Sequence, residues 1–85
     1  MRTLVNSNTE QVRATGIHFV GNVLYISLSD EREIRVPLER VAWLGWLATA
    51  TSEQLAKWSL EPGGFAVYWE ELDDGIEVGR LLEAS

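Results

Sequence analysis

The sequence predicts an α+β domain, in which a three-stranded antiparallel meander is followed by two helices and a further C-terminal strand. Three observations predict it. Apolar residues alternate with other residues across positions 17–36, they recur at helical spacing across positions 41–58, and an apolar, aromatic run follows Gly63-Gly64. A chain of 85 residues has room for one domain. We assign residues 12–85 to this domain and residues 1–11 to a flexible polar lead.

The meander is predicted from local turn signals. Two alternating runs on either side of Gly21-Asn22 predict a β-hairpin with a tight turn. Residues 29–32 predict a second turn, and Ile34 and Val36 belong to a third strand. Pro37 is expected to end that strand, because proline has no backbone N–H to donate. Such a meander has one apolar face and one wet face.

Two short helices are predicted next. The apolar residues of positions 41–48 share one helical face, and Gly45 within this helix would permit close packing against the sheet. Residues 51–54 match a capping box at the start of the second helix. That helix would place Leu55 and Trp58 on one side, three positions apart. Both helices are expected to lie on one face of the sheet.

The C-terminal part is predicted to add one more strand. Residues 65–69 are apolar, aromatic and β-prone, and they follow the loop signal Pro62-Gly63-Gly64. A turn at residues 72–75 leads to a brief extended piece at residues 76–78 and a terminal helical turn at residues 80–82. The strand at residues 65–69 would complete the sheet.

The net charge of −6 is concentrated near the C-terminus. Residues 1–60 hold six basic and six acidic side chains, whereas residues 61–85 hold seven acidic side chains and Arg80 alone. An acidic surface repels phosphate backbones, so we expect no direct nucleic-acid binding and a basic partner protein instead. The sequence lacks cysteine, a signal-peptide pattern and an apolar run long enough to span a bilayer. We therefore expect a cytoplasmic protein that does not contact membranes.

The sequence gives little sign of catalytic chemistry. His18, the only histidine, lies out of phase with the core residues Ile17 and Phe19, so we expect an exposed side chain rather than the base of a serine nucleophile. The carboxylates of residues 70–77 are the hard oxygen ligands that Ca²⁺ and Mg²⁺ prefer, but their spacing does not match a twelve-residue calcium loop. A solvated turn is the simpler interpretation. We expect no enzyme, cofactor or metal site, and we keep a small-ligand or divalent-cation sensor as the alternative.

Four tryptophans are many for a chain of 85 residues. Such side chains serve either a small core or a partner surface. Trp43, Trp58 and Trp69 fall in patterned elements and are expected in the core or at its edge, whereas Trp46 lies off the helical stripe and is the candidate anchor for a partner. Together with the acidic segment, the candidate partner-binding residues are Trp46, Trp69, Glu70, Glu71, Asp73, Asp74 and Glu77.

Several segments, in this order, carry a resemblance to a known family. They are Tyr25-Ile26-Ser27-Leu28, Ile34-Arg35-Val36-Pro37-Leu38, Trp43-Leu44 with Ala48-Thr49, Glu53-Gln54 with Trp58, the segment from Trp69 to Val78, and Leu81-Leu82. Over residues 12–82 the chain resembles a bacterial family of domains of unknown function, number 2442. It departs from the family at Glu70, where proline is usual, and at Asp74-Gly75, where the acidic run is usually fuller.

The resemblance implies a small α+β fold without established catalytic residues. Short members often occur beside a second small protein, which implies a two-gene, toxin–antitoxin-like unit. Longer members carry a helix-turn-helix, for which we expect no room in this chain. With the acidic C-terminal quarter, this favours a non-enzymatic interaction or regulatory module, the antitoxin-like half of a pair whose partner is encoded by a neighbouring gene. A homodimer formed through an uncovered strand edge is compatible with this hypothesis.

Overall fold

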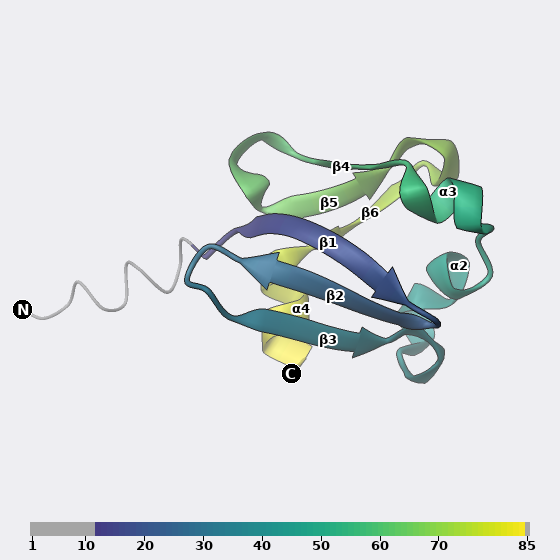
Figure 1. The fold of residues 1–85 in the computed structure, drawn as a ribbon, viewed down its shortest axis with the longest axis horizontal. Helices are drawn as coiled ribbons and strands as arrows, with labels where there is room; N and C mark the ends of the chain where they lie inside the picture. The colour runs from purple at the N-terminus through teal and green to yellow at the C-terminus, as the bar shows by residue number, and fades with distance from the viewer. Residues whose placement is uncertain (1–11, 85) are drawn as a thin grey trace, which may run out of the picture.

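Two small antiparallel sheets make up the fold of residues 12–84, the part of the chain that the computed structural model describes. Sheet A contains, in spatial order, β1 (Ala14–Val20), β2 (Val23–Leu28) and β3 (Glu33–Pro37). Sheet B contains β4 (Trp58–Leu60), β5 (Ala66–Trp69) and β6 (Asp74–Glu77). Figure 1 shows sheet B above sheet A, with β1 on the side of sheet A that faces sheet B. The α+β class is confirmed, while the expected flexible lead lies outside the described residues.

The three-stranded meander of sheet A is confirmed. Gly21, in the β1–β2 turn, has a φ of +59°, a left-handed conformation that tight hairpin turns require and that glycine adopts without strain. β1 and β2 pair from Ala14 opposite Leu28 to Val20 opposite Val23. β3 ends at Pro37, as the missing N–H predicts.

Sheet B is where the fold departs from the predicted layout. α3 (Ser52–Ala56) stops before Trp58, and residues 58–60 form β4 instead of continuing the helix. The expectation that Leu55 and Trp58 share a helical face was therefore wrong, because Trp58 lies in a strand opposite Trp69 of β5. The sequence had placed a turn at residues 72–75 and a brief extended piece at residues 76–78, whereas residues 74–77 pair with β5 as the third strand of the sheet. A three-residue strand is too short for its alternation to be distinguished from helical spacing.

The helix expected at residues 41–48 is broken into shorter pieces. Leu38–Arg40 (η1) and Ala42–Leu44 (η2) are 3₁₀ turns, and only Gly45–Ala48 (α2) is α-helical. Val41 separates the two turns in an extended conformation, with φ −115° and ψ 101°. Gly45 is exposed, and a Cβ built on it would meet no described atom within 4 Å, so the expected close approach to the sheet was wrong.

The capping box of α3 is confirmed. The backbone N–H of Gln54 donates to the Thr51 hydroxyl at 3.1 Å, and the backbone N–H of Thr51 donates to the Gln54 side chain at 3.0 Å. Each bond satisfies an N–H group that has no partner within the first turn of the helix. The cap fixes the start of α3, although the helix ends sooner than expected.

The rest of the chain completes the two layers. Pro62–Gly64 (η3) and Glu70–Leu72 (η4) are 3₁₀ turns at the two ends of β5, and α4 (Val78–Ala84) follows β6 directly. α2 and α3 lie at the end of the sheets where the β1–β2 turn is, while α4 lies behind sheet A (Figure 1). The expectation that the two predicted helices cover one face of the sheet was therefore wrong, because α2 and α3 lie at the end of the sheets. No helix within residues 12–84 has the length and apolar character of a membrane span.

The core lies between the two sheets, α2 and α4. Trp69, Val67 and Ile76 of sheet B are fully or almost fully buried, and so are Leu24 and Ile26 of sheet A. The other buried apolar residues are Val12, Ala14, Leu28, Val36, Leu38, Leu44, Leu47, Val78 and Leu81. Because each sheet turns one face to this core, its other face is left for solvent or for partners.

Candidate functional site

The five carboxylates of residues 70–77 are divided between the two ends of β6. Glu70, Glu71, Asp73 and Asp74 lie in and just after η4, whereas Glu77 ends β6 opposite Ala66. They do not converge on one point. Among residues 12–84, no group of three or more acidic, histidine or cysteine side chains is placed to hold a metal ion.

Three of these carboxylates have partners among the described residues, in the turn itself or in neighbouring elements. Glu71 forms an ion pair with Lys57, with 2.6 Å between oxygen and nitrogen, and Asp73 accepts a hydrogen bond of 2.8 Å from the hydroxyl of Tyr68. Asp74 accepts from the backbone N–H of Gly75 at 2.8 Å. Asp73 itself has a φ of +53°, a left-handed conformation that aspartate tolerates better than most residues. The segment thus forms the structural turn that its composition predicts.

Tyr68 lies at the centre of an acidic surface on the solvent side of sheet B. Val67 and Trp69 point into the core, so Tyr68 between them points outward. Its cross-strand neighbours are Ser59 and Gly75, and its ring covers the latter, because a Cβ on Gly75 would lie 3.3 Å from it. We call this surface, formed by Tyr68 with Glu61, Glu70 and Asp73, the Tyr68 face.

The negative charges of the Tyr68 face affect the pKa of the Tyr68 phenol. The hydrogen bond to Asp73, partial burial, and the negative charges of Asp73, Glu70 and Glu61 all raise the pKa of Tyr68 above its ordinary value. Glu61 precedes β5 in the sequence and was not among the predicted site residues, and neither was Tyr68. The signal that could have found Tyr68 is its position out of phase with Val67 and Trp69.

The candidate tryptophans have different environments. Trp69 is completely buried, and its indole N–H donates to the backbone carbonyl of Leu55 at 3.1 Å. It has no surface to offer a partner, so it is a core residue rather than a contact residue. Trp46 is half-buried and packs edge-on against Trp69, with 6.0 Å between ring centroids and 73° between planes. A role of Trp46 as a partner anchor stays a prediction.

Sheet A presents a different outer face. His18 is exposed, as expected, and stacks on Tyr25 across the β1–β2 pair, with 4.9 Å between ring centroids and 6° between planes. Arg35 of β3 lies opposite Tyr25 on the other side, so these three residues form one cross-strand row. His18 makes no hydrogen bond to a serine within residues 12–84, and the row carries no nucleophile–base pair.

The family follows from comparison with known proteins. The family model described as "Protein of unknown function (DUF2442)" matches residues 14–85. The chain belongs to the DUF2442 family. A search of curated proteins finds no match to this DUF2442 chain.

Two solved structures of uncharacterised bacterial proteins resemble this DUF2442 domain. A protein of unknown function from Rhodospirillum rubrum has a TM-score of 0.71 at 19% identity, over 86% of this chain and 87% of its own. An uncharacterised protein from Chromobacterium violaceum has a TM-score of 0.72 at 23% identity, over 94% of this chain and 72% of its own. At these identities the likeness shows the shared fold alone.

The raised pKa of Tyr68 in this DUF2442 domain can be tested by titration. In a Tyr25→Phe background, Tyr68 is the only tyrosine, and its ultraviolet absorbance should report ionisation above about pH 10, the ordinary midpoint of a tyrosine phenol. Asp73→Asn should lower this midpoint, because it replaces the charged acceptor of the Tyr68 hydrogen bond with a neutral one and so weakens the largest cause of the shift. Glu53→Gln, on α3, is the matched control and should leave the midpoint unchanged.

The same shift predicts a dependence of stability on pH. The folded-state pKa of Tyr68 is raised above the unfolded value, so its contribution to stability is fully present below about pH 10 and is lost as the pH rises through the folded-state pKa. Denaturant unfolding at a series of pH values, with and without Asp73→Asn, measures this loss. An equal loss in both proteins would show that Asp73 does not govern the ionisation of Tyr68.

Proposed function

We propose that this DUF2442 domain is a non-enzymatic protein-interaction module whose Tyr68 face binds a basic partner protein. The observation that carries the proposal is the gathering of Glu61, Glu70 and Asp73 around the outward-facing ring of Tyr68. A tyrosine offers an apolar ring for contact area and a hydroxyl for hydrogen bonding, a combination that is enriched at interfaces. The carboxylates around it supply negative potential.

Charge complementarity defines the chemistry of the partner. A surface with this negative potential attracts lysine- and arginine-rich surfaces and repels nucleic-acid backbones. Glu71 is already neutralised by Lys57, whereas Glu61 and Glu70 are exposed and form no ion pair with another residue of positions 12–84. These two side chains are therefore the contacts most open to a basic partner.

The biological role that fits this surface is regulation by occlusion. The resemblance implies that short members of the family lie beside a second small protein, which favours a neighbouring gene product as the partner. This domain would then cover a basic surface of that protein, as the antitoxin-like half of a two-gene unit. The face would speed association through electrostatic steering, and the aromatic ring would add buried contact.

Titration of the purified domain with the neighbouring gene product tests the proposal. Glu61→Lys combined with Glu70→Lys should weaken binding by about tenfold or more and reduce its dependence on salt, because rim charges act on association and are screened by ions. Glu39→Lys combined with Glu53→Lys makes the same change of net charge on η1 and α3. This matched control should bind within about threefold of the original protein.

Two outcomes would contradict the proposal. If the neighbouring product does not bind the original domain, the postulated partner is wrong. If the control variant loses as much affinity as the variant of the Tyr68 face, net charge alone governs binding and the face has no specific role. Circular dichroism of both variants establishes that the fold is retained.

A further inference from the structure

β3 leaves one edge of sheet A open. It is an outer strand of that sheet, pairs with β2 on one side only, and runs along the lower margin of the sheet in Figure 1. An open strand edge presents unpaired N–H and C=O groups that can pair with another strand. β3 has five residues, and those whose backbone groups face the open edge determine which strand can pair with it.

The register of β2 and β3 identifies these edge-facing residues. The backbone N–H of Leu28 donates to the carbonyl of Arg32 at one end of the β2–β3 ladder, and the backbone N–H of Leu38 donates to the carbonyl of Asn22 at the other end. Every second pair of opposite residues, counted from either end, is therefore a hydrogen-bonded pair. Ile34, opposite Ile26, belongs to this set and turns its backbone groups toward β2. The backbone N–H and C=O groups of Glu33 and Arg35 consequently point to the open edge.

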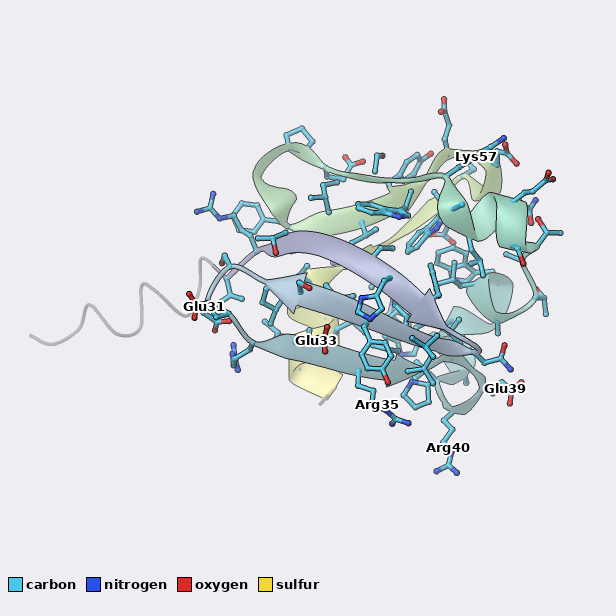
Figure 2. The ribbon with its side chains drawn as sticks, viewed as in Figure 1. Glu31, Glu33, Arg35, Glu39, Arg40 and Lys57 are labelled. Atoms are coloured by element: carbon cyan, nitrogen blue, oxygen red, sulfur yellow. The ribbon has the colours of Figure 1, made fainter. Side chains whose placement is uncertain are left out.

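The side chains of Glu33 and Arg35 are exposed, opposite in charge and two positions apart. Both project from the same face of β3, and Figure 2 shows Arg35 reaching past the open edge. The two ion pairs found within residues 12–84 involve other side chains, so neither charge is neutralised by the described part of the chain. Side chains of opposite sign at alternate positions make the edge complementary to an inverted copy of itself.

We propose that this DUF2442 domain forms a homodimer in which β3 pairs antiparallel with β3 of a second copy, about a two-fold axis at Ile34. In this register Glu33 of each copy lies directly opposite Arg35 of the other, and the two residues exchange both backbone hydrogen bonds. Ile34 meets its own copy in the intervening pair, where side chains approach most closely. Two three-stranded sheets become one six-stranded sheet.

The residues of β3 also disfavour the neighbouring register. A two-fold axis at Arg35 would place two arginines opposite each other, which is destabilising. It would also place Pro37, which has no N–H, opposite Glu33 and remove one hydrogen bond on each side. Charge and proline therefore favour the axis at Ile34 over the axis at Arg35.

The contact is short, so the dimer is expected to be weak and reversible. A pair of five-residue strands buries far less than the roughly 1,200 Å² of a stable interface, which places it among transient interactions. Edge charges can also serve to prevent strand pairing, and the experiment separates the two roles. The proposal is independent of the Tyr68 face, which lies on the other sheet, and its test uses this chain alone.

Sedimentation velocity of the full chain, from low micromolar to millimolar concentration, tests the dimer. We expect a monomer that converts to a dimer as concentration rises. Glu33→Arg and Arg35→Glu should each weaken self-association by about tenfold or more, because each places like charges opposite each other. An equal mixture of the two variants should associate again, since one carries two arginines at these positions and the other carries two glutamates.

The double variant Glu33→Arg/Arg35→Glu reverses both charges and should dimerise like the original chain. Glu53→Arg and Arg13→Glu make the same single charge changes away from β3 and should leave self-association unchanged. A chain that stays monomeric at millimolar concentration overturns the proposal. So does a dimer that survives both single variants, or a mixture that associates no better than either variant alone. Slower amide hydrogen exchange at Glu33 and Arg35 at high protein concentration than at low concentration would locate the pairing at β3.

Discussion

Replacing Trp69 with alanine is expected to lower the free energy of unfolding by about 3–5 kcal/mol. Trp69 has no exposed surface, and its ring packs against Phe19 of β1 at 6.4 Å and Trp46 of α2 at 6.0 Å between centroids. Alanine would leave a cavity where sheet A, sheet B and α2 meet. A domain of this length has roughly 4–13 kcal/mol of stability in total, so the loss is a large part of it.

Urea unfolding followed by circular dichroism measures this loss against two other variants. Trp69→Phe retains much of the apolar volume but leaves the carbonyl of Leu55 without its indole donor, so we expect a loss of about 1–2 kcal/mol. Phe65→Ala removes a side chain that is 49% exposed and should cost less than about 1 kcal/mol. If Trp69→Ala is no more harmful than Phe65→Ala, the packing of the two sheets around Trp69 is wrong.

The sequence predicts sheet A well because its determinants are local. The left-handed turn at Gly21 and the missing N–H of Pro37 act within a few residues of where they stand. The capping box at Thr51 is equally local, since both of its hydrogen bonds span three residues. Each of these features forms in the structure as expected.

Sheet B could not be predicted as fully, because its first strand is too short to show a pattern of its own. β4 is defined by the partnership of Trp58 with Trp69, eleven positions later, and three residues give no independent pattern. The helix predicted at residues 41–48 was also only partly right. There helical spacing of apolar residues was visible, but the extended backbone of Val41 divides the segment into separate turns.

The sequence predicted that the candidate site is acidic, but not how the fold arranges its residues in space. The acidic segment was visible in the sequence, but the fold separates Glu77 from the η4 carboxylates and brings Glu61 toward Tyr68 instead. Whether Trp69 belongs to the core or to a partner surface likewise depends on packing that a linear sequence does not show. The edge complementarity of Glu33 and Arg35 appears only once the register of β2 and β3 is known.

Gly64→Ala is expected to destabilise the domain by about 2–3 kcal/mol, because two unfavourable terms coincide at this position. Gly64 has a φ of +75°, a left-handed conformation that alanine adopts only with strain. A Cβ there would also lie 2.7 Å from the backbone carbonyl oxygen of Ala14, which belongs to β1. The loop before β5 would have to move away from sheet A, and the contact between the two sheets would loosen.

Two alanine variants separate these terms when all three proteins are unfolded in urea. Gly63 has a φ of +86°, but a Cβ there would meet only the exposed ring of Phe65, which can rotate, so Gly63→Ala reports the backbone strain without the overlap. Gly45→Ala, in α2 with open space around it, should stabilise the domain by up to about 1 kcal/mol. We expect Gly64→Ala to be more harmful than Gly63→Ala by at least about 1 kcal/mol. Equal losses at the two glycines would mean that the close approach of Gly64 to Ala14 does not hold the sheets together.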